Sequence, residues 1–375
     1  DKDDIVIDGG YSHYTDTLRR IGSLKDKGFH FMGIGISGGE EGARRGPSIM
    51  PGGDEGAYKQ VEPILKAVSA KVGDDPCVAY LGKEAAGHYV KMVHNGIEYS
   101  IMQLISECYD LLHTAMDYSN EDLHRLFASW DQGPMKSFLL EITAAIFARK
   151  DDKPTSNCLV DMILDRAGAK GTGQWTSQEG LDLPMPIPNI DTAVMMRNLS
   201  SLLEQRLLAS EIYSGPTPKI SLPRAEVESL LFDAFYLATV LSYAQGLALL
   251  TRASAERKME IPMWDVVSVW RGGCIIRSAL LENFREAYKN PALANLLLDP
   301  PIASMVKPLE KGLAQIVQLA ARHGIPAPGL MSALNYYHAY RRKTLPTNLI
   351  QAQRDFFGAH TYQRIDQPGI FHTQW

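Results

Sequence analysis

The chain has 375 residues, of which 45% are hydrophobic and 22% charged, so it is long enough for two domains and has the composition of a soluble globular protein. The formal net charge of -5 argues against a general nucleic-acid-binding protein. The four cysteines stand at wide spacings without a Cys-x-x-Cys pair, which indicates neither a zinc site nor a disulfide framework and favours a reducing cytoplasm.

The first part of the chain, residues 1–83, alternates strand-like and helix-like patterns and is predicted to be an α/β segment. This order of elements predicts parallel or mixed strand pairing, as in the second half of a doubly wound, Rossmann-like sheet whose first half is absent. The expected strands are 5–8, 29–36 and, in the same sheet, 77–81, and the expected helices are 15–27 and 54–71.

The second part, residues 84–345, has almost no strand signal and is predicted to be an all-α domain with long helices such as 88–116 and 225–258. The segment Trp130–Leu140 loosely repeats Trp270–Leu281, and each follows a long helix, which leaves a duplicated helical unit and coincidence both open. We find no apolar run near the 18 residues of a membrane span, and the initial Asp-Lys-Asp-Asp is not a signal peptide, so no membrane partner is expected.

The last part, residues 346–375, is too aromatic for a disordered tail and too interrupted by Gly and Pro for one helix. Phe356 and Tyr362 are among its aromatic residues, and we expect this tail to pack on a partner subunit. Arg354 and His360 lie in the same segment. They either complete an anion pocket or fix the tail by hydrogen bonds.

One helical face in the second part carries an acid, a base and two hydrogen-bonding groups. At 100° per residue, Lys91, His94, Asn95 and Glu98 fall on nearly the same side of the predicted helix. Two turns separate the amine from the carboxylate, roughly 10 Å along the axis, which suits proton transfer at the two ends of a small sugar acid. The alternative is a solvated polar stripe, the usual reason for Lys and Glu on a helix surface.

A glycine-rich run follows the predicted strand 29–36. In Ser37-Gly38-Gly39, the absence of side chains lets backbone N–H groups approach a carboxylate or phosphate, and strand ends are where α/β sheets bind ligands. The alternative is a tight turn before a surface loop. The nearby Met50-Pro-Gly-Gly53 is interpreted as the end of a strand.

A second group of residues suits a terminal phosphate. Lys170 and Thr172 place a cation and a hydroxyl in a flexible Gly-rich backbone, without the spacing of a nucleotide P-loop. Arg197 follows on an apolar helix, where an inward-facing guanidinium needs an anionic partner from the protein or from a ligand. For each residue a structural role is the alternative.

Together these motifs resemble those of the 6-phosphogluconate dehydrogenase family, and they occur in family order over the whole chain. The run Gly87–Tyr99 and the tail motif Asn348–Tyr362 are the most specific. The other motifs are Ile7-Asp-Gly-Gly10, Ser37-Gly-Gly-Glu-Glu-Gly-Ala43, Gly46-Pro-Ser-Ile-Met-Pro-Gly-Gly53 and Lys170-Gly-Thr-Gly173.

Members of that family oxidise 6-phosphogluconate at C3 with NADP, release CO2 and yield ribulose 5-phosphate, and the resemblance implies this reaction here. Lys91 matches the general base, which requires a lowered pKa, and Glu98 matches the acid that protonates C1 of the enediol, which a carboxyl shielded from water can do. No metal is implied, because the lysine supplies the electrophile.

The resemblance also implies how the substrate is held. Ser37, Gly38, Gly39, His94 and Asn95 match residues that bind its carboxylate and hydroxyls, and Tyr99, Lys170, Thr172 and Arg197 match the phosphate pocket. In the family, a homodimer completes that pocket with the residues that match Arg354 and His360.

The chain departs from the family pattern at several positions. Tyr11 replaces an Asn that lies near the nicotinamide and the substrate, and a bulkier tyrosine cannot supply both amide functions, so the cofactor contact at Tyr11 is left open. Residues 1–36 contain neither the Gly-rich dinucleotide loop nor the basic residues that select NADP. We therefore expect a fragment or processed product that, alone, oxidises substrate slowly.

Two other functions compete with this one. A related β-hydroxyacid dehydrogenase would keep Ser37-Gly-Gly and Lys91 but would not need the phosphate-pocket residues Lys170, Thr172 and Arg197. A non-catalytic, dimeric phosphosugar-binding module would explain the missing dinucleotide loop but not the intact Lys91 and Glu98. The dehydrogenase is the first choice for the parent protein.

Overall fold

A computed structural model describes residues 2–213, 215 and 218–375. The chain forms two compact units, one that ends at Leu334 and a second, Asn335–Trp375. The first unit contains a small α/β segment followed by a large helical part, as the sequence predicts. Because the α/β segment and the helical part belong to the same compact unit, the domain boundary expected at residues 83–84 stays a prediction.

The α/β segment is built on a three-stranded sheet of order β1-β2-β3. Strands β1 (Ile5–Asp8) and β2 (His30–Ser37) are parallel, whereas β3 (Ser48–Gly53) is antiparallel to β2, so the pairing is mixed. The register pairs Asp8 with Gly33 and Ser37 with Ser48. The carboxyl ends of β1 and β2 therefore lie at the same edge, where this class of sheet places its ligands.

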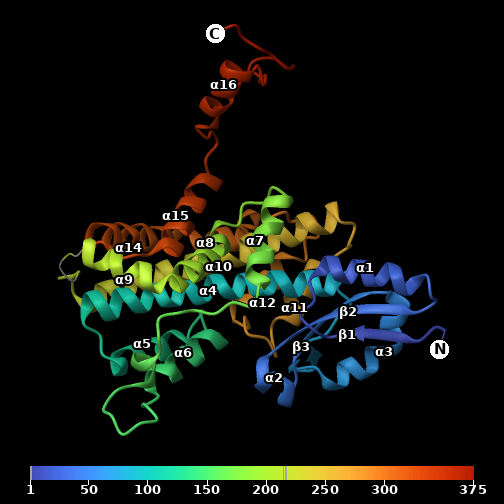
Figure 1. The fold of residues 1–375 in the computed structure, drawn as a ribbon, viewed down its shortest axis with the longest axis horizontal. Helices are drawn as coiled ribbons and strands as arrows, with labels where there is room; N and C mark the ends of the chain where they lie inside the picture. The colour runs from blue at the N-terminus through green and yellow to red at the C-terminus, as the bar shows by residue number, and fades with distance from the viewer. Residues whose placement is uncertain (1, 214, 216–217) are drawn as a thin grey trace. The chain divides into compact units, whose positions relative to one another are not determined.

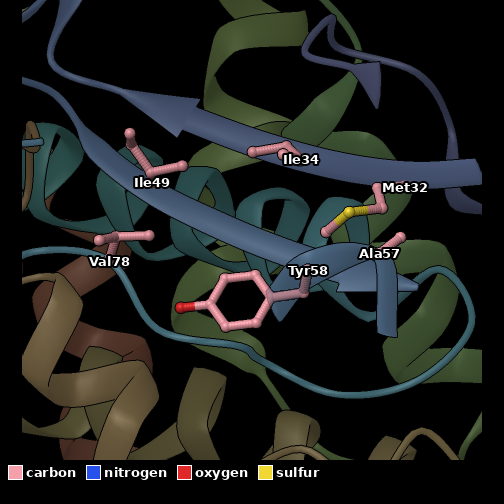
Figure 2. Close-up of a cluster of buried hydrophobic side chains, with 6 residues drawn as sticks. All are labelled: Met32, Ile34, Ile49, Ala57, Tyr58 and Val78. Carbon is pink, nitrogen blue, oxygen red and sulfur yellow. The ribbon is translucent and has the colours of Figure 1, made fainter. Parts of the chain in front are cut away.

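Helix α3 (Glu55–Val68) covers one face of this sheet, and α1 (Tyr14–Lys25) lies on the other (Figure 1). Asp54 caps α3 by accepting a hydrogen bond from the backbone N–H of Ala57, the Ncap arrangement that favours helix initiation. Alternate residues of β2 and β3 point toward α3 and are buried with it. Figure 2 shows this cluster, which comprises Met32, Ile34, Ile49, Ala57, Tyr58 and Val78.

Glycines bring helix α4 (Ala86–Met116) directly onto the face of the sheet opposite to α3. A Cβ built on Gly35 would overlap the side chain of Lys91, and a Cβ built on Gly52 would overlap the backbone of Gly87. Met50-Pro-Gly-Gly53 forms the last four residues of β3, which ends at Gly53, as the sequence interpretation expects. Glycine inside a strand marks here a close backbone approach.

The strand expected at residues 77–81 does not form as a full sheet member. Lys71–Val72 (β4) and Asp75–Pro76 (β5) make a separate antiparallel hairpin. The chain that follows touches β3 through one parallel bridge, Ile49 with Val78, and through single backbone bonds such as Leu81 N–H to Pro51 carbonyl. Pro51 has no N–H to donate to this neighbour, so a continuous ladder is interrupted.

The helical part is organised around α4 and α10 (Arg224–Glu256), which lie side by side (Figure 1). The repeated segments follow these helices and pair with each other: Ser137 bridges Ser278, and Phe138 N–H donates to the Arg277 carbonyl at 3.1 Å. This symmetric contact supports the duplicated unit. In chain order, α5 (Asn120–Trp130) and α6 (Phe138–Ala148) follow α4 as α11 (Met263–Val269) and α12 (Leu280–Ala287) follow α10.

Further helices complete this unit and position the site. Two of them, α7 (Thr172–Asp182) and α8 (Pro188–Ser201), pack on α4. The remaining elements are α2 (Gly39–Arg45), η1 (Leu159–Met162), α9 (Leu203–Ile212), η2 (Leu296–Leu298), α13 (Pro300–Val306), η3 (Lys307–Leu309), α14 (Glu310–His323) and α15 (Pro328–Tyr340), the last of which continues into the second unit.

Helix α10 is long and apolar enough, by length and composition, to cross a membrane. The expectation that no apolar run approaches that length is wrong for this helix. The most apolar window of α10 is 94% buried within the protein, as in the core helix of a globular fold.

The second unit carries the tail. It contains α16 (Thr347–Gly358) and an antiparallel bridge between Tyr362 and Phe371. The buried Asp355 carboxylate accepts hydrogen bonds from His372 Nδ1, at 2.9 Å, and from the backbone N–H of Thr361, at 2.9 Å. The tail is thus folded on its own helix, as its aromatic composition predicts.

Candidate functional site

A pocket of about 480 Å³ lies where the carboxyl ends of β1 and β2 meet α4, α7 and α8. It collects most of the residues that the sequence predicts for the site: Tyr11, Ser37, Gly38, Gly39, Lys91, Asn95, Glu98, Tyr99, Lys170, Thr172 and Arg197. Gly168, Ala169 and Ile275 also line it and were not predicted. The solvated polar stripe considered for α4 is therefore wrong, because this face is buried against the sheet and α7.

Lys91 is only 5% exposed and projects from the first turns of α4 into this pocket. Its Nζ lies 3.4 Å from His94 Nδ1 and 5.7 Å from the centre of the Tyr11 ring. Burial disfavours the ammonium form and lowers the pKa of Lys91 from 10.5 to about 8, although the nearby Glu98 partly opposes this shift. A substantial fraction of neutral amine is therefore present near neutral pH, as a general base requires.

Glu98 stands two turns further along the same face. Burial raises the pKa of its carboxyl above the ordinary value, against the opposing effects of Lys91 and Arg197. Its Oε2 lies 3.8 Å from His94 Nδ1, and the side chain is 21% exposed. A base with a lowered pKa and an acid with a raised pKa thus face one cavity, which is the electrostatic pattern of an acid–base site.

His94 is fully buried, and it is not among the residues that line the pocket. Its Nε2 lies 3.2 Å from Ser37 Oγ, its Nδ1 lies 3.0 Å from Asn95 Oδ1, and its ring packs edge-on against Trp270. Burial, reinforced by the charge of Lys91, holds the pKa of His94 well below its usual value, so the ring is neutral. The imidazole therefore connects Ser37 to Lys91 behind the pocket wall.

The glycines after β2 allow a turn that other residues would strain. Gly38 and Gly39 have φ of 132° and 60°, and a Cβ on Gly38 would stand 2.7 Å from the Gly273 carbonyl oxygen. Ser37 Oγ accepts a hydrogen bond from the backbone N–H of Ile275 at 3.4 Å. The loop that contains Gly273 and Ile275 thus forms one wall, although the sequence suggested it only as part of a repeat.

Arg197 and Tyr99 form the cationic end of the pocket. The guanidinium carbon of Arg197 lies 3.4 Å from the centre of the Tyr99 ring, and its Nη1 donates to the Gly168 carbonyl at 3.0 Å. Burial lowers the pKa of Arg197 from its usual value, but a guanidinium stays protonated in proteins. The Thr172 hydroxyl accepts a hydrogen bond from Asn95 Nδ2 at 3.1 Å, which joins α7 to α4 beside this cation.

Arg354 and His360 belong to the second unit. Arg354 Nη1 donates to Gln351 Oε1 at 3.1 Å, and the His360 ring packs edge-on against Phe357. The expectation that these two residues complete the phosphate pocket in a homodimer stays a prediction.

Two family profiles together match all of the chain except residues 83–86. The C-terminal domain of 6-phosphogluconate dehydrogenase matches residues 87–375, and the NAD binding domain of 6-phosphogluconate dehydrogenase matches residues 1–82. The chain belongs to the 6-phosphogluconate dehydrogenase family, as the sequence motifs predict.

Individual proteins agree with this assignment. The chain is 50% identical, over 377 residues, to a Bacillus subtilis protein named 6-phosphogluconate dehydrogenase, NADP(+)-dependent, decarboxylating, and 48% identical to the decarboxylating enzyme of Escherichia coli. Each match covers all of this chain and 80% of the relative. The structure of Plasmodium falciparum 6-phosphogluconate dehydrogenase matches it with a TM-score of 0.97 and 44% identity, over all of this chain and 81% of that one.

Proposed function

We propose that the protein converts 6-phosphogluconate to ribulose 5-phosphate and CO2 with NADP as the hydride acceptor. The observation that carries this proposal is the single pocket that holds Lys91, whose pKa is lowered to about 8, and Glu98, whose pKa is raised, beside the stacked Arg197. The name of the Bacillus subtilis relative includes NADP dependence and decarboxylation and supports the same reaction.

Lys91 acts as the general base. Its neutral amine accepts the proton of the C3 hydroxyl as the hydride leaves C3, and the resulting ammonium then polarises the 3-keto oxygen while CO2 departs. Both states must be accessible, and a pKa of about 8 makes them so near neutral pH. The ordinary pKa of 10.5 would leave almost no free base.

Glu98 acts as the general acid. After decarboxylation the enediol takes up a proton at C1, and burial raises the pKa of the Glu98 carboxyl, which favours the protonated form that can donate it. The two groups stand two turns apart on α4, so they address different carbons of one bound substrate.

The remaining residues hold the substrate. Ser37, Gly38, Gly39 and Asn95 bind its carboxylate and hydroxyls, and His94 orients Ser37 and Lys91 from behind. Tyr99, Lys170, Thr172 and Arg197 bind the phosphate, for which a guanidinium offers paired donors. In a homodimer, the pocket is completed by Arg354 of the partner subunit and His360 of the partner subunit.

NADP supplies the nicotinamide ring that accepts the hydride. The residues present fit that end of the cofactor: Tyr11 follows the carboxyl end of β1, lines the pocket beside Lys91 and is 58% exposed. Within the described ranges, no Gly-rich dinucleotide loop follows a strand. We therefore assign only the nicotinamide end, to Tyr11.

Two features support a cytoplasmic homodimer. All four cysteines are buried and unpaired, as in proteins of a reducing compartment. The tail exposes an apolar hollow of about 300 Å³ that contains Phe356, Phe357 and Trp375, and a surface of this kind is suited to a second subunit.

Calorimetric titration with 6-phosphogluconate tests the proposal. We expect binding by the wild-type chain that Arg197→Ala weakens at least 10-fold, and that Arg354→Ala also weakens through the partner's pocket. Arg364→Ala is the matched tail control, because Arg364 pairs with Asp366 at the surface. A folded, dimeric wild type without affinity for 6-phosphogluconate would contradict the proposal.

A further inference from the structure

A buried carboxylate on α7 is unused by the proposed chemistry. Glu179 is 4% exposed and does not line the pocket. It accepts hydrogen bonds from Tyr14 Oη at 2.6 Å, from Tyr89 Oη at 2.9 Å, and from Nε and Nη2 of Arg257, each at 3.0 Å. Three separate elements thus meet at one side chain: α1 through Tyr14, α4 through Tyr89 and the end of α10 through Arg257.

Glu179 is the last of three polar contacts that fix α7 along α4. Thr172 bonds to Asn95, Thr176 Oγ1 donates to the Met92 carbonyl at 2.9 Å, and Glu179 bonds to Tyr89. The α7 residues follow the spacing i, i+4, i+7, which places them on one face, while their α4 partners step back toward the helix N-terminus. The contacts therefore define an antiparallel register.

Different kinds of contact hold the two ends of this register. A Cβ on Gly173 would stand 2.5 Å from the Tyr99 ring, and a Cβ on Gly96 would stand 2.7 Å from Thr176, so near the pocket a side chain of each helix packs directly on a glycine of the other. Two turns away, the helix is held by the charged, bidentate pair of Glu179 with Arg257. Loss of that pair removes the charged contact that resists sliding of α7 along α4, and such a slide would move Thr172 at the pocket end.

We propose that Glu179 is a positioning residue that holds α7 in register on α4 and so places Thr172 and Lys170 against the phosphate of the substrate. The inference rests on the proposed function, since it concerns the phosphate end of the same pocket. The geometry of Lys91 is set by the sheet under α4 and is expected to be independent of Glu179. The phosphate contribution to binding should therefore change, and the contribution of the sugar acid should not.

The test compares two ligands that differ only in the phosphate, 6-phosphogluconate and D-gluconate, on the full chain. We expect Glu179→Gln to weaken 6-phosphogluconate at least 5-fold and to leave the weak affinity for D-gluconate, followed by ligand-observed NMR, within 2-fold. Glu107→Gln is the matched control. Glu107 is an equally buried carboxylate that accepts the backbone N–H of Gly329 and Leu330, far along α4 from α7, so this variant should change neither affinity.

Hydrogen–deuterium exchange supplies a readout without ligand. We expect faster exchange in residues 172–182 for Glu179→Gln and unchanged exchange there for Glu107→Gln. Equal loss of both ligands, or an unchanged affinity for 6-phosphogluconate, would overturn the positioning role. A wild-type chain that binds neither ligand would contradict the proposed function instead, and unchanged exchange in α7 would still overturn the register.

Discussion

Two buried polar clusters share helix α4, and they are built in opposite ways. Around Tyr89, the Glu179 carboxylate receives four hydrogen bonds, two of them from an arginine. Around Lys91, the ammonium lies 3.4 Å from His94, and the Glu98 carboxyl comes no nearer than 3.8 Å to that ring. Only two positions of one helix separate Tyr89 from Lys91.

The difference separates a cluster that holds helices in register from one whose side chains take part in the chemistry. A buried carboxylate that is fully hydrogen-bonded and paired is stable as it stands, but it has no capacity left for a ligand. A buried amine with weak partners has a shifted pKa and free hydrogen-bonding capacity, and it costs stability. Replacing Glu179 should therefore lower stability together with the affinity for 6-phosphogluconate, whereas replacing Lys91 should lower turnover and raise stability.

The largest expected effect is on turnover. Lys91→Met removes the base and the electrophile at once and should lower the rate of ribulose 5-phosphate formation by about 10²- to 10⁴-fold, the usual contribution of a general base. Because turnover by this chain is expected to be slow, product is best measured over hours at high protein concentration. Arg271→Lys, at a cation paired with Asp75 and Glu282 away from the pocket, is the control. Retained turnover in Lys91→Met would refute the assignment.

Removing the Glu179 carboxylate should lower the stability of the fold. Glu179→Ala leaves two tyrosine hydroxyls and a guanidinium without their acceptor and should lower the free energy of unfolding by about 3 kcal/mol, somewhat reduced because Arg257 is 28% exposed. Denaturant titration measures it. Glu40→Ala breaks an exposed pair with Arg44 and should cost less than about 0.5 kcal/mol. Similar losses in both variants would mean that the cluster is not a structural centre.

Lys91→Met should raise the free energy of unfolding, whereas Glu179→Ala should lower it. The pKa of Lys91 is depressed from 10.5 to about 8, so below pH 8 the folded state holds a disfavoured charge, which methionine removes. We expect a gain of about 2 kcal/mol at pH 7. Between pH 8 and 10.5 the unfolded chain binds more protons than the folded one, so wild-type stability rises and the gain shrinks. Unfolding curves at pH 7 and 9.5 test this sign, and a destabilised variant at pH 7 would contradict it.

The smallest expected effects are those of replacing two arginines, Arg197 and Arg257, by lysine. Arg197→Lys keeps the charge but loses the flat contact with Tyr99, and it should weaken 6-phosphogluconate about 10-fold, or about 1.4 kcal/mol, with little change in stability. Arg257→Lys loses the bidentate bond to Glu179, so it should lower stability and, through α7, also weaken 6-phosphogluconate, as Glu179→Gln does. Calorimetry and denaturant titration on both variants show whether the loss of stability is confined to Arg257→Lys.

Sequence reasoning reached the catalytic cluster because its residues are close in sequence. Lys91, His94 and Glu98 follow helical spacing, and a local motif also reveals Ser37. Glu179 and Arg257 are 78 positions apart, so no local pattern could join them. The end of a strand at Met50-Pro-Gly-Gly53 could be predicted, but the contact of Gly52 with α4 could not, because Gly87 lies more than thirty residues later in the chain.

The glycines under α4 also fix how closely the helix approaches the sheet. The helix backbone rests on Gly52, and the stem of Lys91 rests on Gly35, with no space for a methyl group at either position. Such contacts cannot be compressed, and they leave no flexible side chain to absorb a displacement. The depth at which the amine meets its substrate is therefore a property of the sheet backbone, and an alanine at Gly35 or Gly52 would displace the amine although neither glycine lines the pocket.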